Sequence, residues 1–501
     1  MNVSISKTTI APESGVSFWD RAADWVEARS GILAIVLCAC FAGLMLAIAA
    51  RRPFWCDEII TVTIARAPTI PDLFADFRLS FDQTPPLNAI LVRAFSFYFG
   101  WTELAARLPS VIFATGGLLL IFHLVRRLTN GLLGLASMSI LLVTVLPSYA
   151  YEARPYAMLF FASALALWFW TSEPDASTRR STGMSISFGL AMMLAVFAHY
   201  YAVLLILPFA ADELQSRKLR RIPSFTLLCG ALGIGLALAI QSPFIRAASQ
   251  FRKIPFGGIP SFQNLQWTYV ELLARLISVS VCMLLLFAWG SSRKVTFVEG
   301  QSRYERLGWF FLGIPLAGYV LAEFVTHAFR PRYFISVLAG LGLAFGCSLY
   351  RWNRGTAWAL LTLLVAGLLF AETSVSHFRY ARTPVVSRRA EDSDFADTML
   401  PRFRKDKKLY VLVPTLMSYV EARYYAPNPQ MIRVLLPPNY PLWFISQNPI
   451  GIRYFSMADL RRYGRETAFV APSPDLLSTL DKLGFHIRWR MTQPEAVVYL
   501  D

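Results

Sequence analysis

Long apolar runs separated by short polar segments dominate the first three quarters of the chain. The first run, Gly31–Ala50, contains no charged residue, and about 20 apolar residues are what a helix needs to cross a bilayer. Further spans are predicted near 109–125, 131–149, 155–171, 225–245, 267–290, 308–327, 333–350 and 355–373. This pattern predicts a mainly α-helical, multi-pass membrane protein.

The stretch 184–211 leaves its number of crossings open. One helix of this length would be about 42 Å long, whereas the hydrocarbon core is about 30 Å thick. Basic clusters flank the stretch on both sides, at Arg179-Arg180 and at Arg217-Lys218. If both clusters are cytoplasmic, the chain crosses twice, with His199-Tyr200-Tyr201 at the outer apex.

Segments 70–81 and 87–101 show helical apolar spacing but are short. We interpret both as amphipathic helices that lie in the membrane interface. A crossing at 87–101 would place Arg126-Arg127 outside and spoil the charge asymmetry of the loops. About eleven spans result, with tail 1–30 in the cytoplasm, a transmembrane module over 31–373, and loop 51–108 outside.

The tail 374–501 alternates short β-like runs with helical ones. Strands are predicted at 409–414, 432–436, 468–471, 487–491 and 496–500, and helices at 417–424, 457–463 and 474–483. This alternation predicts that the tail forms a small extracytoplasmic α/β domain. It has no glycine-rich phosphate loop, and a stabilising or docking role is the simplest interpretation.

Composition supports this picture and excludes other classes. Hydrophobic residues make up 55% of the chain and charged residues 16%, against about 45–50% and about 25% in soluble proteins. The net charge of +16 fits basic cytoplasmic loops, and without an aromatic-interleaved basic patch we expect no nucleic-acid partner. The six cysteines imply no disulfide framework.

The first outer loop carries two adjacent carboxylates directly after the first span. Asp57 and Glu58 precede the predicted interfacial helices. A carboxylate beneath such helices is partly desolvated, which raises its basicity and suits it to general-base catalysis. Charged residues at a membrane boundary can also simply be solvated, so position alone leaves both interpretations open.

Other outer segments add charged and aromatic residues. Asp82 stands before Pro85-Pro86, a rigid corner that stops any helix before residue 87. Glu152 and Arg154 in the second outer loop either pair with each other or face a cavity. Each remaining candidate has a structural and a binding interpretation: Tyr156, His199, Tyr200, Arg330, Arg332 and Tyr333.

A guanidinium group can bind phosphate through two parallel hydrogen bonds, so Arg330 and Arg332 are candidates for phosphate binding. Both could also be interfacial anchors. The candidates together place carboxylates, a His-Tyr pair and an arginine-rich corner on one membrane face. An anionic lipid-linked substrate needs both cations for its phosphate and a base for the incoming nucleophile. The sequence contains no metal-ligand spacing, phosphate loop or Gly-x-Ser-x-Gly motif.

The ordered motifs resemble the glycosyltransferase C superfamily, near the protein O-mannosyltransferase and aminoarabinose lipid A transferase branches. The resemblance covers roughly residues 30–350. It is carried by Trp55-Cys56-Asp57-Glu58, Asp82-x-Thr84-Pro85-Pro86-Leu87, Glu103, Arg107-Leu108-Pro109-Ser110, Glu152-Ala153-Arg154-Pro155-Tyr156 and His199-Tyr200.

The resemblance implies transfer of a hexosyl or pentosyl group from a polyprenyl-phosphate donor to an acceptor hydroxyl, generally with inversion. It assigns Asp57 to the essential Asp of the first outer loop and Glu152 to a second acidic position. Arg332 and Tyr333 match the Arg-Tyr that serves the donor phosphate. Glu58 is a further catalytic candidate, and the other substrate-binding candidates are Asp82, Arg154, Tyr156, His199, Tyr200 and Arg330.

The implied partners are the lipid-linked sugar donor, the bilayer and a cell-envelope acceptor, such as lipopolysaccharide, another polysaccharide or protein. The expected location is the cytoplasmic (inner) membrane, with the active face and the C-terminal domain periplasmic or extracytoplasmic. Many relatives have His or Lys where this chain has Thr84, so a metal or phosphate contact of that position is not expected here. No cofactor is predicted, and a divalent metal is left open.

Two other functions compete with this one. A flippase for lipid-linked sugars would also need many spans and intramembrane charge. The sequence shows no inverted repeat and no pair of broken helices in matching halves, which are typical of transporters. A scaffold without activity is the third hypothesis, and the retained Asp57-Glu58 pair argues against it.

Overall fold

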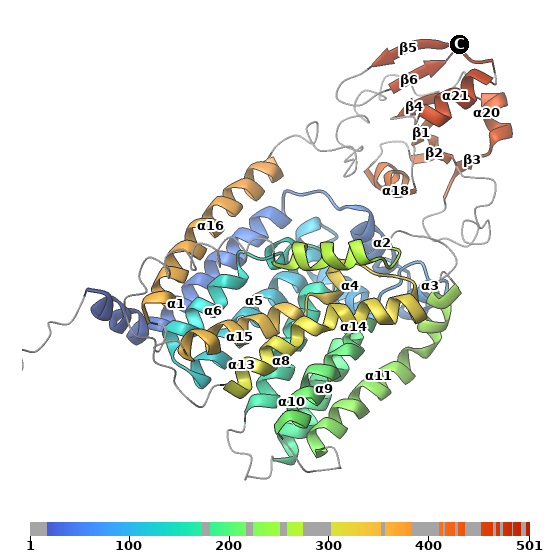
Figure 1. Ribbon diagram of the computed structural model, residues 1–501. Helices are drawn as coiled ribbons and strands as arrows, with labels where there is room; N and C mark the ends of the chain where they lie inside the picture. Colours follow the sequence, from blue (N-terminus) through green and yellow to red (C-terminus); the bar gives the residue numbers. More distant parts are fainter. Residues whose placement is uncertain are drawn as a thin grey trace, which may run out of the picture.

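The computed structural model places a helical bundle under a small α/β domain (Figure 1). It describes residues 18–172, 181–216, 224–250, 258–273, 302–351, 356–382, 410–413, 416–425, 429–435, 452–463, 467–470, 474–482, 484–491 and 497–500.

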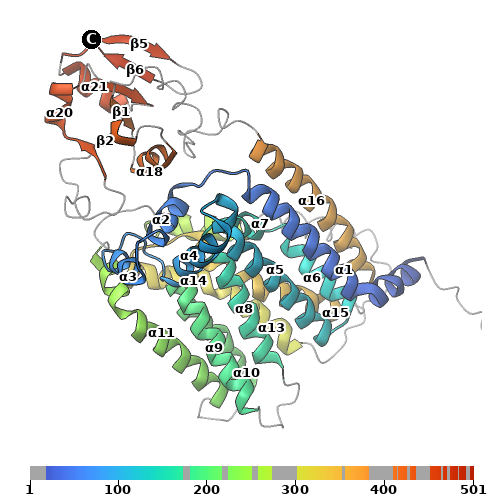
Figure 2. The same cartoon turned by 180° about the vertical axis from the view of Figure 1, so that it is seen from behind.

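In this described part, five helical segments are long and apolar enough to cross a membrane. They include α1 (Phe18–Ala49), α5 (Glu103–Leu128) and α11 (Phe225–Ser249). The fourth, Ser302–Thr326, comprises α13 (Ser302–Phe310), η3 (Phe311–Gly313), α14 (Ile314–Leu321) and η4 (Ala322–Thr326). The fifth is the apolar part of α16 (Thr356–Arg382), which lies beside α1 in both views (Figures 1 and 2). The chain is thus a multi-pass membrane protein.

Shorter helices also belong to the bundle. They are α6 (Gly131–Leu141), α7 (Leu146–Ala150), α8 (Tyr156–Thr171), α9 (Thr182–Ala198), α10 (Ile206–Ser216) and α15 (Val337–Arg351). Helices α9 and α11 approach closely because glycines meet there: a Cβ on Gly233 would lie 2.1 Å from the carbonyl oxygen of Gly189. Small residues at such contacts are how helices pack closely in a membrane.

Several predicted spans differ in detail from the helices observed. The predicted span 131–149 is broken between α6 and α7, and α16 continues to Arg382, past the predicted boundary at 373. Residues 262–273 are helical, while 274–290 of the predicted span 267–290 lie outside the described residues.

The stretch 184–211 does not form one continuous helix. Helix α9 ends at Ala198, and His199 adopts an extended backbone with φ −155° and ψ 135°. The short helix η1 (Tyr200–Leu205) and then α10 follow. The break therefore falls at the predicted apex.

The first outer loop folds into three short helices, α2 (Cys56–Ala65), α3 (Ile70–Arg78) and α4 (Leu87–Phe99). Helices α3 and α4 match the two predicted amphipathic segments. With 13 residues, α4 is only about 20 Å long, too short for a bilayer core of about 30 Å. Helix α2, which begins at the Cys56-Asp57-Glu58 sequence, was not predicted.

The C-terminal residues form a six-stranded sheet in the order β3-β2-β1-β4-β6-β5. The strands are β1 (Tyr410–Val413), β2 (Ile432–Leu435), β3 (Tyr454–Phe455), β4 (Thr467–Val470), β5 (Ile487–Met491) and β6 (Val497–Leu500). Neighbours among β3, β2, β1 and β4 pair in parallel, and β6 pairs antiparallel with β4 and β5. The helices are α18 (Leu416–Tyr425), α20 (Met457–Tyr463) and α21 (Pro474–Lys482). All were predicted except β3.

Helix α18 joins the C-terminal domain to the first outer loop. Tyr419 and Val420 pack in one apolar cluster with Ile59 of α2. The Glu421 carboxylate accepts a hydrogen bond of 2.8 Å from the Cys56 backbone N–H, at the start of α2. The domain and the outer loop therefore lie at the same end of the bundle (Figures 1 and 2).

Candidate active site

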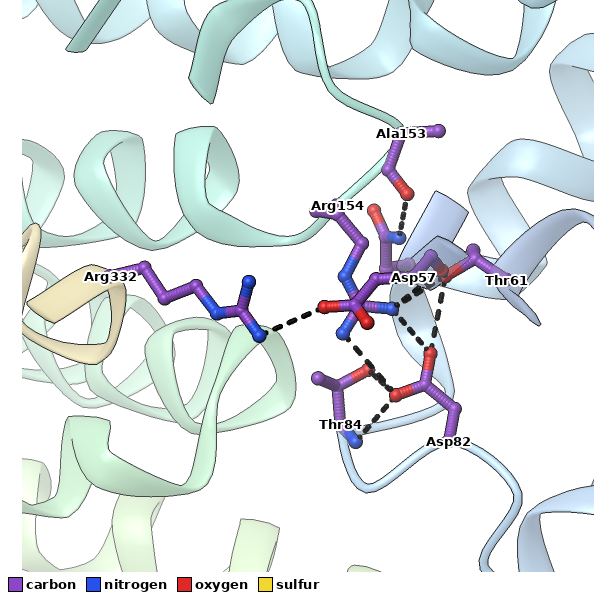
Figure 3. A network of polar contacts seen from close by, with 8 residues as sticks. Asp57, Thr61, Asp82, Thr84, Ala153, Arg154 and Arg332 are labelled. Atoms are coloured by element: carbon purple, nitrogen blue, oxygen red, sulfur yellow. Dashed lines mark hydrogen bonds and ion pairs between the residues drawn. The ribbon is translucent and has the colours of Figure 1, made fainter. Parts of the chain in front are cut away.

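Asp57 lies in the first turn of α2 and faces an arginine that is distant in the sequence. Its Oδ2 is 2.9 Å from an Nη of Arg332, which belongs to η5 (Pro331–Phe334). Both side chains keep contact with solvent, with 15% of Asp57 and 25% of Arg332 exposed. Figure 3 shows Arg332 reaching Asp57 from one side, while Asp82 lies on the other. Asp57 and Arg332 thus form an acid–arginine pair that keeps contact with solvent.

Glu58, the next residue, points into the protein interior. Its two oxygens accept hydrogen bonds of 2.7 and 2.6 Å from Arg107, and both side chains are 0% exposed. The same carboxylate accepts from the backbone N–H groups of Trp55 and Ala153. Arg107 also donates to the carbonyls of residues 49, 52 and 53. This geometry favours a structural task for Glu58, because its carboxylate is fully buried and both oxygens are hydrogen-bonded.

Asp82 forms a second buried ion pair, with Arg154 at 2.7 Å. Thr84 donates to its Oδ1 through both the backbone N–H and the hydroxyl, at 2.9 and 2.8 Å, and Thr61 donates to its Oδ2 (Figure 3). Arg154 also donates to the backbone carbonyl of Asp57, at 3.2 Å. The pair predicted as one alternative, Glu152 with Arg154, is not formed. Asp82 and Arg154 instead tie the Pro85-Pro86 corner to α2.

Glu152 is 9% exposed, and its Oε2 has no hydrogen-bond partner in the described structure. Burial raises the pKa of this carboxyl to about 7, helped by Glu58 and Asp57 and opposed by Arg52 and Arg332. Glu152 is therefore partly protonated near neutral pH and can both donate and accept a hydrogen bond.

Aromatic rings surround Arg332. Its guanidinium carbon lies 5.3 Å from the Trp55 ring centroid and 5.7 Å from that of Tyr156, within cation–π range. Tyr333 packs against His199, with ring centroids 4.6 Å apart and the ring planes tilted by 37°. Burial, together with Arg154 and Arg332, lowers the pKa of His199 to about 3, so its imidazole is neutral.

Two candidates lie farther out. Tyr200 is half-buried in η1, and Asp82 is close enough to help raise the pKa of its hydroxyl. Arg330 precedes η5, and its charge acts on Glu271. Within the described residues neither side chain has a hydrogen bond or ion pair to the Asp57–Arg332 pair.

The structure adds residues that sequence reasoning missed. Thr61 and Trp55 face the ion pairs from α2 and its start, Tyr149 lies on α7, and Glu271 lies on helical residues 262–273. Glu271 falls inside a predicted span, where an isolated acidic residue was the one available signal. Among the described residues, no group of three or more His, Cys, Asp or Glu could hold a metal ion.

The described residues combine a membrane helical bundle, short helices over a charged site and a C-terminal α/β domain. Comparisons with known proteins bear out the predicted resemblance to the glycosyltransferase C superfamily, through one family match and a shared fold. The family described as dolichyl-phosphate-mannose-protein mannosyltransferase matches residues 83–245 of this chain.

The crystal structure of ArnT from Cupriavidus metallidurans bound to undecaprenyl phosphate has the same fold, with a TM-score of 0.60 and 15% identity over 95% of this chain and 98% of that one. Its apo form matches with a TM-score of 0.60 and 14% identity over the same shares. An oligosaccharyltransferase of Archaeoglobus fulgidus, crystallised with zinc and sulfate, gives a TM-score of 0.41 and 14% identity over 83% of this chain and 61% of that one. A search by sequence finds no match among curated proteins.

Proposed function

We propose that this protein is an extracytoplasmic glycosyltransferase that moves a sugar from a polyprenyl-phosphate donor to an acceptor hydroxyl of a cell-envelope lipid, polysaccharide or protein. The observation that carries the proposal is the accessible Asp57–Arg332 pair, 2.9 Å apart, at the end of the bundle covered by interfacial helices. The ArnT-type fold supports it, because that transferase fold is seen with undecaprenyl phosphate bound.

The pair supplies the two groups that the reaction needs. The acceptor oxygen attacks the anomeric carbon while Asp57 takes the hydroxyl proton as general base. The bond from that carbon to the phosphate oxygen breaks, and its electron pair leaves with the polyprenyl phosphate. Arg332 stabilises the charge that develops on the phosphate. Transfer then proceeds with inversion.

The surrounding residues hold these groups in place. Two buried ion pairs, Glu58–Arg107 and Asp82–Arg154, hold the first outer loop in place around α2. Glu152, whose Oε2 has no partner in the described structure, would bind a sugar or acceptor hydroxyl, and Tyr333 packs against neutral His199. Arg330 and Tyr200 would contact the donor farther from the reacting carbon. We expect positioning and electrostatic stabilisation of this kind to supply most of the rate enhancement.

The proposed topology places the site and the C-terminal domain outside the cytoplasm, in the inner membrane. Arg126 and Arg127 end α5 on the side opposite the first outer loop, where the positive-inside rule predicts cytoplasm. A donor in the outer leaflet could then reach Arg332 from the bilayer.

The test is single-turnover transfer in detergent, with a panel of undecaprenyl-phosphate sugars as donors. Asp57→Asn is nearly isosteric and should abolish transfer without loss of expression. A charge-assisted hydrogen bond is worth about 1.5–3 kcal/mol, so Arg332→Ala should lose roughly ten- to a hundredfold. Arg332→Lys should recover only part, since an ammonium lacks the bidentate fork.

Glu323→Gln is the matched control, because this acid is exposed on η4 and should leave transfer unchanged. Near wild-type transfer by Asp57→Asn would remove Asp57 as the base. A flippase would instead translocate the lipid-linked sugar with no transfer by any variant.

A further inference from the structure

Glu271 is a carboxylate with little to hold it in place. It is half-buried on helical residues 262–273, in a segment predicted to span the membrane. Its Oε1 accepts a hydrogen bond of 3.1 Å from the hydroxyl of Tyr149. The described residues provide no other hydrogen bond or ion pair for it, although a carboxylate can accept about four hydrogen bonds. Acidic residues at such depth are costly and usually functional.

Tyr149 connects Glu271 to the candidate active site. Its ring packs on Tyr156, with centroids 5.1 Å apart, and Tyr156 in turn lies beside Arg332. Glu271, Glu152, Tyr156 and Arg332 all act electrostatically on the Tyr149 hydroxyl. Glu271 thus joins the residues around Arg332, although it comes from a different part of the bundle.

The same neighbourhood contains buried polar atoms without partners. In the described structure these include Oε2 of Glu152, the hydroxyl of Tyr156 and Nε of Arg332. Buried polar atoms are almost always hydrogen-bonded, so a group of them indicates that a ligand or water completes the set. A sugar ring suits this set, since its hydroxyls both donate and accept and its C–H face can pack on an aromatic ring.

We propose that Glu271 is a specificity-determining residue that accepts hydrogen bonds from the hydroxyls of the donor sugar, while Tyr149 holds the carboxylate in position. The inference rests on the proposed function. A phosphate at Arg332 is one bond away from the sugar's anomeric carbon, so the ring must lie beside this arginine. Two carboxylate oxygens can take two neighbouring hydroxyls and so favour one sugar epimer over another.

The experiment compares binding of bare undecaprenyl phosphate with binding of undecaprenyl-phosphate mannose, glucose, galactose and arabinose. The full-length protein is used in lipid nanodiscs. Wild type should bind at least one sugar-bearing lipid more tightly than the bare lipid. Glu271→Gln should reduce that preference about tenfold and leave bare-lipid binding unchanged. Tyr149→Phe should shift the preference in the same direction, and the exposed control Glu323→Gln should not change it.

Three results would overturn the inference: an unchanged sugar preference in Glu271→Gln, an equal loss of bare-lipid binding, or no sugar preference in wild type. Failure of wild type to bind any of these lipids would refute the proposed function itself.

Discussion

Replacement of Arg107 by methionine would test whether the first outer loop depends on one buried ion pair. Arg107 holds the Glu58 carboxylate through two hydrogen bonds, and the same guanidinium donates to the carbonyls that end α1 and lead into the loop. Methionine preserves most of the side-chain volume. It removes the charge and every one of these donors.

The expected cost follows from the burial of both partners. Removing one member of a buried ion pair costs about 3–5 kcal/mol, because the other charge stays buried without compensation. Glu58 keeps its bonds from the N–H groups of Trp55 and Ala153, which limits the loss, so we expect about 4 kcal/mol for Arg107→Met. The double variant Glu58→Gln/Arg107→Met should be more stable than Arg107→Met alone, since it leaves no buried charge.

Thermal unfolding in detergent, measured for the two single variants and the double variant, yields the coupling between the residues. Folded Glu58→Gln should also retain transfer activity, in contrast to Asp57→Asn. A cost below about 1 kcal/mol for Arg107→Met, or a double variant less stable than both single ones, would refute this account. Loss of turnover in a fully stable Glu58→Gln would show that Glu58 acts in the chemistry.

Two further predictions concern neighbouring carboxylates. The pKa of Glu152 is raised to about 7 in the folded protein, against about 4.3 when unfolded, so its contribution to stability is complete below about pH 4.3 and is lost as the pH rises to about 7. The melting temperature of wild type should therefore fall more steeply over that range than that of Glu152→Gln, and parallel curves would contradict the assignment. Glu421 accepts from the Cys56 N–H at the positive end of α2, where a carboxylate is worth about 0.3–1 kcal/mol. Glu421→Gln should lose about that stability and slow transfer several-fold, whereas unchanged turnover would show that the domain contact does not position Asp57.

Local patterns in the sequence were enough to predict most elements. Apolar runs of span length identified α1, α5 and α11, because backbone groups in a bilayer must bond within a helix. Helix α20 occupies the predicted residues, Met457–Tyr463. Double proline before residue 87 and the short apolar stripe after it predicted α4. Each of these signals lies within the segment that it describes.

From the charge asymmetry of the loops and the order of the motifs, we also predicted that most site residues lie on one membrane face. Asp57, Asp82, Arg154 and Arg332 were all candidates from the sequence, and they meet in one network (Figure 3). Their residue types suggested the chemistry, since a base and a phosphate-binding cation are what an anionic lipid-linked donor needs.

Only the tertiary structure decided which acid pairs with which arginine. Asp57 and Glu58 are adjacent and chemically alike, yet successive residues on a helix point about 100° apart. One therefore faces solvent and Arg332, and the other faces Arg107 in the core. Glu271 could not be assigned to the site from the sequence either, because it lies within a predicted span. It comes near Arg332, through Tyr149, only because α7 packs against residues 262–273. Pairings between distant segments depend on helix rotation and packing, which no local pattern encodes.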